Sequence, residues 1–104
     1  MADLGLLNDD MIAISNVFRN NPAITRAVVF GSRAKGGGSL YADVDIALYG
    51  DIELLEMEDI ICDLDELPLV YKFDVITYDR IRNYRLKQHI DKVGTIIYDK
   101  DANM

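Results

Sequence analysis

The chain has 104 residues, enough for one hydrophobic core, and half of them are hydrophobic. Its formal charge of −7 argues against a nucleic-acid-binding face, which needs clustered Lys and Arg, and is compatible with a basic protein partner. The chain has no apolar run of the roughly 18 residues that a membrane helix needs, no signal-peptide pattern at its start and only one cysteine, so we expect no membrane span and no internal disulfide, in a cytoplasmic protein.

The first half of the chain predicts one helix and two strands. Apolar residues recur at helical spacing over residues 9–19. Residues 24–30 are apolar with a β-branched centre, which is typical of a buried strand. Residues 43–49 alternate strictly between polar and apolar, which predicts a strand with one buried face.

The second half continues the alternation of helices and strands. Residues 51–66 carry an apolar stripe at helical spacing, residues 71–77 read as a third strand, residues 80–93 as a basic helix and residues 95–98 as a short last strand. The expected fold is α/β (α+β), with a small mixed sheet, helices packed on one face and the order αβ(α)βαβαβ. The bracketed element is the loop between the first two strands. We expect one domain over residues 1–104, with its core at about 10–98 and a C-terminal tail at 99–104.

A glycine-rich loop, beginning GSRAKGGG at Gly31, leaves the first predicted strand. It is not a P-loop, because glycines stand where that motif needs Lys and then Ser or Thr. It is not a dinucleotide fingerprint either, because Arg33 stands at the position of the second glycine. Gly31 and Ser32 can nevertheless offer backbone N–H groups and one hydroxyl to a phosphate oxygen. Residues 36–38 are equally consistent with a plain flexible linker.

One of the three Asp-x-Asp pairs has a setting suited to metal binding. The pairs at 63–65 and 99–101 lie on a predicted helix and in the tail, where we expect solvated side chains. Asp43 and Asp45 lie on a predicted strand, whose alternate residues share a face, so the two carboxylates can chelate Mg²⁺. Asp74 on the third predicted strand joins them if the two strands are neighbours. The alternative is three exposed acids at strand ends.

These residues together resemble a known family pattern. Gly31-Ser32, ten further residues and then Asp43-Val44-Asp45 reproduce the G-S-x10-D-x-D signature of the polymerase-β-like nucleotidyltransferase superfamily. Asp74 matches the third carboxylate that this superfamily carries on a later strand. The short length and the local form "FGSRAKG…DVDIAL" look most like the minimal nucleotidyltransferase (MNT) group, the MntA-type antitoxins. The resemblance extends from about residue 10 to residue 98.

The resemblance implies a set of phosphate contacts. Gly31 and Ser32 would hold the β- and γ-phosphates of an incoming ATP. Arg33 would steady the triphosphate, and Lys35 is a second candidate for that role. An exposed loop cation without a function is the alternative for both.

The resemblance also implies the metal site and the reaction. Asp43 and Asp45 would bind two Mg²⁺ ions, and Asp74 would complete the second site and help to deprotonate the acceptor hydroxyl. The family often has Ser where this chain has Ala42, a position that is not a ligand. The expected activity is nucleotidyl transfer, with AMP passing to an acceptor oxygen and pyrophosphate leaving.

MNT proteins are similar to the enzyme half of two-component toxin–antitoxin modules. Their usual partner is a small helical HEPN protein, and the MNT subunit transfers AMP to one of its tyrosines. The resemblance therefore implies an antitoxin that forms a hetero-oligomer with a HEPN toxin. Two alternatives are a non-catalytic antitoxin that neutralises its partner by contact, and a nucleotidyltransferase that acts on a small molecule.

For two further features we expect ordinary surface or packing roles. His89 is the only histidine, so neither a histidine-based catalytic triad nor a histidine-rich zinc site can form, and we expect it at the surface or in helix-end packing. Basic residues gather on the predicted helix over 80–93, which predicts a solvated helix face, with contact to a partner or to phosphate as the alternative: these are Arg80, Arg82, Arg85 and Lys87.

Overall fold

The computed structural model describes residues 4–34 and 43–103, which form three α-helices, four strands and two short 3₁₀-helices. In chain order these are α1 (Asn8–Arg19), β1 (Arg26–Phe30), β2 (Val44–Tyr49), α2 (Leu54–Asp65), β3 (Phe73–Thr77), η1 (Tyr78–Arg80), α3 (Tyr84–Val93), β4 (Thr95–Asp99) and η2 (Lys100–Asn103). This order confirms the expected α/β class. A helix between β1 and β2 would fall on residues 35–42, outside the described residues. No helix within the described ranges is long and apolar enough to cross a membrane.

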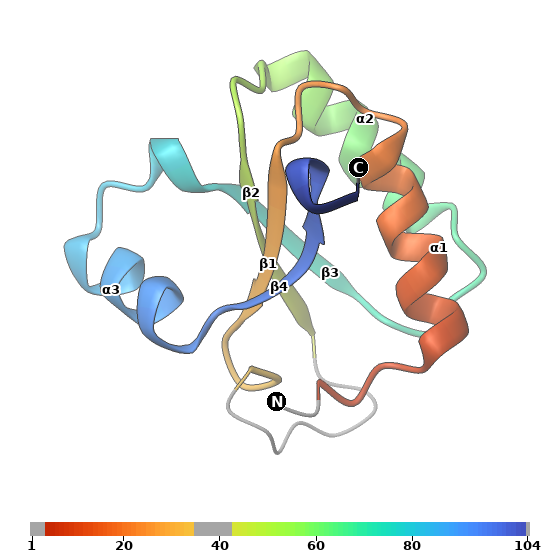
Figure 1. Ribbon diagram of the computed structural model, residues 1–104, viewed down its shortest axis with the longest axis horizontal. Coiled ribbons are helices and arrows are strands. Elements are labelled where there is room, and N and C mark those ends of the chain that lie inside the picture. Colours follow the sequence, from red (N-terminus) through yellow and green to blue (C-terminus); the bar gives the residue numbers. More distant parts are fainter. Residues whose placement is uncertain (1–3, 35–42, 104) are drawn as a thin grey trace.

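The strands of the described residues form one mixed sheet in the order β3-β2-β1-β4 (Figure 1). β1 runs antiparallel to both β2 and β4, whereas β2 and β3 are parallel. Parallel neighbours need a crossover connection, and α2 supplies it between β2 and β3. This crossover is what brings the third strand beside the second, as the sequence interpretation required.

The main core lies on the sheet face that α1 and α2 cover. Ala27 and Val29 of β1 and Ile46 and Leu48 of β2 are fully buried there. Figure 1 shows both helices on the same side of the sheet. Each fully buried aliphatic side chain stabilises the fold by about 1.5–3 kcal/mol. The helices contribute apolar residues at helical spacing, namely Ile14, Val17 and Phe18 from α1 and Met57, Ile60 and Leu64 from α2.

A smaller cluster lies on the opposite face of the sheet, under α3. Val28, Phe30 and Ala47 of the central strands pack there with Ile90 of α3. In Figure 1, α3 lies on the other side of the sheet from α1 and α2. The expectation of helices on one face therefore holds for α1 and α2 but not for α3.

Helix α3 begins four residues later than the expected start at residue 80. Asn83 is its N-cap, and the Asn83 side chain accepts hydrogen bonds from the backbone N–H groups of Arg85 and Leu86, at 3.0 and 3.2 Å. Arg80 belongs instead to η1, and its guanidinium donates to the Ile52 carbonyl at 2.8 Å. Arg80 thus ties the segment after β3 to the segment before α2, and it is separated from the basic face of α3.

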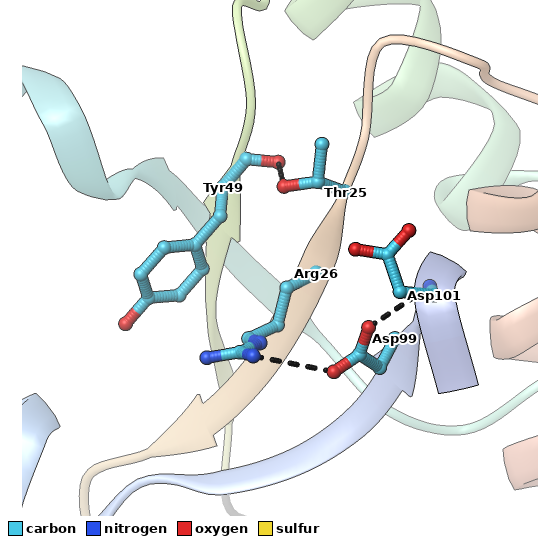
Figure 2. Close-up of polar contacts among 5 residues, drawn as sticks. All are labelled: Thr25, Arg26, Tyr49, Asp99 and Asp101. Atoms are coloured by element: carbon cyan, nitrogen blue, oxygen red, sulfur yellow. Dashed lines mark hydrogen bonds and ion pairs between the residues drawn. The ribbon is translucent and has the colours of Figure 1, made fainter.

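The C-terminal residues are more ordered than the expected tail. Asp99 is the last residue of β4, and it forms an ion pair of 3.2 Å with Arg26 of β1 (Figure 2). Its other carboxylate oxygen accepts a hydrogen bond from the Asp101 N–H at 3.0 Å. On the other side of β1, the Thr25 hydroxyl donates to the Tyr49 carbonyl at 3.1 Å. The interpretation of Asp99 as an unanchored tail residue was therefore wrong, because β4 extends one residue further than predicted.

Candidate active site

Two aspartates lie side by side on the sheet face that α3 partly covers. The parallel register of β2 and β3 pairs Asp45 with Asp74. The antiparallel register of β1 and β2 pairs Asp45 with Phe30, whose side chain belongs to the cluster under α3. Because paired residues on neighbouring strands point to the same face, both carboxylates emerge on the α3 side. The two strands are thus neighbours, which is the condition on which the grouping of Asp74 with Asp45 depended.

Asp43 stands at the start of the same strand. It directly precedes β2 and is exposed, whereas Asp45 is half-buried. Val44 between them is fully buried on the core face, and its N–H donates to the Lys72 carbonyl at 2.8 Å. The inward side chain of Val44 fixes the alternation of the strand, so the two flanking aspartates are directed away from the main core.

Asp45 feels both its own burial and the charges of the other two acids. Burial raises the pKa of the Asp45 carboxyl, the negative charges of Asp74 and Asp43 raise it further, and His89 lowers it. Asp45 is thus the carboxylate on which desolvation and like charge converge. This arrangement favours the binding of a cation, because a positive charge would offset the repulsion of Asp45 by Asp74 and Asp43.

Gly31 brings the end of β1 against Asp45. Its φ of +77° lies in the left-handed region, and a Cβ at this position would collide with Oδ2 of Asp45. Only glycine provides both the backbone turn and the space for the carboxylate. Ser32 follows on the exposed side of the turn. The glycine–serine turn and the acids therefore meet at one place, although ten residues separate Ser32 from Asp43 in the sequence.

Arg33 is placed differently from the exposed loop cation that the sequence predicted. It is fully buried, and its guanidinium donates to the backbone carbonyls of Leu4 at 2.8 Å and Gly5 at 3.3 Å. The same group lies over the Tyr71 ring, 5.2 Å from its centroid. Nη1 of Arg33 is thus bound to the N-terminal segment, and the expected contact of Arg33 with a triphosphate stays a prediction. Lys35 and the glycines at 36–38 lie outside the described residues.

His89 is the site residue that sequence reasoning missed. Its Nε2 accepts a hydrogen bond from the Gly31 N–H at 3.2 Å, and its ring meets Phe30 edge-on with centroids 6.2 Å apart. It sits on α3 three residues after Leu86 and next to the buried Ile90, both of which pack against the sheet. That helical spacing was the available signal, since positions three apart share a helix face.

A polar hollow of about 830 Å³ adjoins the site along α3. His89 lines it together with Tyr78 and the basic residues Arg85, Lys87 and Lys92. The Tyr78 hydroxyl donates to Asp91 at 2.8 Å, and this hydrogen bond raises the pKa of Tyr78 to about 12. The hollow therefore gives an otherwise acidic chain three basic residues along α3, with Asp91 as the acid in the same lining, and His89 links it to the Gly31 turn.

The donor set suits magnesium rather than a preformed metal cage. Within residues 4–34 and 43–103, no three His, Cys, Asp or Glu side chains are already gathered as a metal-binding group. The register does gather Asp45 and Asp74 as a pair, and burial, followed by the negative charges of Asp74 and Asp43, raises the pKa of Asp45. Mg²⁺ binds through one or two carboxylates while keeping waters and substrate phosphates as its other ligands. These residues fit that mode of binding.

Comparisons with known proteins point to one family. A family model described as polymerase beta, nucleotidyltransferase matches residues 13–103. A comparison with the curated proteins gives no significant match.

Solved structures with a similar fold include three from toxin–antitoxin systems. One is described as a toxin–antitoxin with AMP-PNP, with a TM-score of 0.70 and 19% identity, covering 93% of this chain and 77% of the other. A second is the toxin–antitoxin MntA–HepT, with a TM-score of 0.67 and 15% identity, covering 93% and 76%. A third is a tri-AMPylated Shewanella oneidensis HEPN toxin in complex with an MNT antitoxin, with a TM-score of 0.66 and 16% identity, covering 90% and 73%. At these identities the likeness is one of fold.

Proposed function

This chain belongs to the polymerase-β nucleotidyltransferase family, and we propose that it is an antitoxin that transfers AMP from ATP to a tyrosine hydroxyl of a small helical HEPN toxin. The observation that carries the proposal is the pairing of Asp45 with Asp74 across β2 and β3, with the Gly31 turn held against Asp45. Nucleotidyl transfer needs phosphates held beside acidic groups, and this contact provides that arrangement within one short stretch of the sheet.

Gly31 and Ser32 are the proposed phosphate contacts. Both stand where β1 ends, and the Ser32 side chain is exposed and free to donate from its hydroxyl to a phosphate oxygen. Basic residues line the hollow along α3. Their positive charge would offset part of the negative charge of a triphosphate, in a chain whose formal charge is −7.

Asp43, Asp45 and Asp74 are the residues that would hold two Mg²⁺ ions. When bound, the ions supply charge neutralisation for the oxygens around the reacting phosphorus. Asp74 is exposed on β3, and in this proposal it helps to take the proton of the acceptor hydroxyl. The acceptor oxygen forms a bond to the α-phosphorus, the bond from that phosphorus to the bridging oxygen breaks, and pyrophosphate leaves with the electron pair.

The proposed partner follows from the similar folds. The solved structures of this fold include toxin–antitoxin pairs, one with AMP-PNP and one with an AMPylated HEPN toxin. The acidic charge of this chain would attract a basic protein partner and favour a hetero-oligomer. The carboxylates lie on an accessible face, so an incoming tyrosine from a second protein can approach them.

The test is intact mass spectrometry of the helical protein encoded beside this chain, after incubation with the chain, Mg²⁺ and each nucleoside triphosphate in turn. We expect one or more AMP adducts with ATP, and none with the double variant Asp43→Asn/Asp45→Asn. The matched control is Asp63→Asn/Asp65→Asn, which changes the same motif on the exposed side of α2 and should leave the adduct intact.

Two outcomes would point to the alternatives. A stable complex without any adduct would identify a non-catalytic antitoxin that acts by contact. An adduct on a small molecule but not on the protein would identify the other transferase class. Either result would contradict the proposed protein acceptor.

A further inference from the structure

The backbone N–H of Gly31 already has a hydrogen-bond acceptor within the chain. The acceptor is Nε2 of His89, at 3.2 Å from the Gly31 nitrogen. This contact links the end of β1 to α3, 58 residues further along the chain. The His89 ring is held in place by its edge-on contact with Phe30, at 6.2 Å between centroids.

This bond has a consequence for the phosphate contact. A backbone amide has one hydrogen to donate, and a neutral imidazole that accepts at Nε2 carries its proton on Nδ1. If a phosphate oxygen binds the Gly31 N–H, as the proposed function holds, the oxygen and the imidazole nitrogen compete for the same hydrogen. One of them must leave when the other binds.

We propose that the His89 ring competes with a nucleotide phosphate for the hydrogen of the Gly31 N–H. The phosphate must displace the ring before it can bind this group. This inference rests on the proposed function and names a residue that sets the nucleotide affinity of the same site. The His89 ring has space to move into, since His89 lines the hollow of about 830 Å³ along α3. The helix itself can stay in place, because Ile90 anchors it to the sheet.

The proposal predicts tighter nucleotide binding when the acceptor is removed. Breaking a neutral intramolecular hydrogen bond before binding weakens the apparent affinity by roughly two- to tenfold. The variants His89→Phe and His89→Leu have no acceptor, and the first also keeps an aromatic ring against Phe30. The variant His89→Gln keeps an acceptor oxygen on a chain of similar reach.

The experiment is isothermal titration of each full-length variant with ATP and Mg²⁺, with thermal unfolding to confirm that each is folded. We expect the Phe and Leu variants to bind ATP about two- to tenfold more tightly than the wild type, and the Gln variant to stay closer to the wild type. Gln88→Ala is the matched control, because Gln88 lines the same hollow and its side chain donates to Tyr84 rather than contacting Gly31. It should leave the affinity unchanged.

A second readout follows the bond itself. In ¹H–¹⁵N spectra without nucleotide, the Gly31 amide proton should move upfield in the Phe and Leu variants, and the His89 Nε2 resonance of the wild type should shift when ATP is added. An unchanged Gly31 resonance in these variants would overturn the inference whatever the nucleotide does.

The remaining outcomes separate the two proposals. A wild type that binds ATP, with Phe and Leu variants that bind it equally or less tightly, would overturn the role of His89 and leave the proposed function standing. A Gln variant as tight as the Phe variant would also overturn it, because ring bulk rather than the acceptor would then matter. Failure of every variant to bind ATP would overturn both proposals.

Discussion

At the level of single residues, the contact between Gly31 and Asp45 is the most demanding in the site. A methyl group on Gly31 would occupy the place of Oδ2 of Asp45, and its φ of +77° is unfavourable for any other residue. We predict that Gly31→Ala lowers the free energy of unfolding by about 1–3 kcal/mol and abolishes AMP transfer. Urea unfolding and the mass-spectrometric assay measure the two effects.

Gly50→Ala is the control for this prediction. Gly50 has a φ of +134°, and its added Cβ would meet the backbone carbonyl of Ala23, far from the carboxylates. The Gly50→Ala variant should also have a lower free energy of unfolding, while the nucleotide affinity of its folded fraction stays unchanged. Full transfer activity in Gly31→Ala would contradict the close packing of the turn on Asp45.

The ionised form of Asp45 is unfavourable in the folded chain. Its pKa is raised in the folded chain, first by burial and then by Asp74 and Asp43. Its contribution to stability is therefore complete below the ordinary value of 3.8 and is lost as the pH rises through the raised value. We predict that Asp45→Asn, measured with a metal chelator, has a higher melting temperature than the wild type at pH 7.

The pH series decides the origin of that gain. The difference in melting temperature should disappear below pH 3.8, where the wild-type Asp45 carboxyl is protonated in both the folded and the unfolded chain. Asp63→Asn, on the exposed side of α2, controls for the change in net charge. A lower melting temperature for Asp45→Asn at pH 7 would mean that Asp45 has a stabilising partner instead.

At the level of elements, α3 carries His89 and closes the second face of the sheet, and its start depends on Asn83. The Asn83 side chain accepts from two backbone N–H groups of the first turn. We predict that Asn83→Ala lowers the free energy of unfolding by about 1 kcal/mol, measured by urea titration. The control Asn20→Ala changes an exposed asparagine that follows α1 and should have little effect. Equal losses in both variants would argue against the cap.

The element types were predictable from the sequence because each has a clear period. The alternation of Val44, Ile46 and Leu48 identified β2 and its buried face. The sequence also predicted the later strand with Asp74, but its place beside β2 was only a condition of the site and not a prediction. Element ends were harder to predict. The start of α3 depends on the local cap at Asn83. Arg80 is drawn out of the helix by its bond to the Ile52 carbonyl, 28 residues away in the sequence.

The candidate site was predictable where neighbouring residues define it and not where distant ones do. Gly31, Ser32 and the aspartates follow from a spacing that can be read along the chain. The contact of His89 with Gly31 depends on α3 folding back onto β1, and the contacts of Arg33 depend on the N-terminal segment returning to the loop after β1. Both are tertiary contacts, for which the sequence offered only a lone histidine and a loop cation.

At the level of the whole molecule, contacts from Arg33 and Tyr71 fasten the N-terminal segment to the rest of the domain. Arg33 donates to the carbonyls of Leu4 and Gly5 and lies over the Tyr71 ring. The Tyr71 hydroxyl in turn donates to Asp10 of α1 at 2.7 Å. Arg33, the residue after the proposed phosphate contact Ser32, thus links the loop after β1 to the N-terminal segment.

This arrangement predicts that Arg33→Leu separates stability from nucleotide binding. The variant removes the donor of the buried Leu4 carbonyl, and an unsatisfied buried polar group costs about 1–3 kcal/mol. The matched control is Arg26→Leu, which removes an exposed ion pair with Asp99 worth about 0–1 kcal/mol. Urea unfolding should therefore show the larger loss for Arg33→Leu. ATP affinity, measured where both variants are folded, should stay close to that of the wild type, because the buried guanidinium faces backbone carbonyls. If a folded Arg33→Leu chain no longer binds ATP while the Arg26→Leu chain does, Arg33 contributes to phosphate binding and the prediction is wrong.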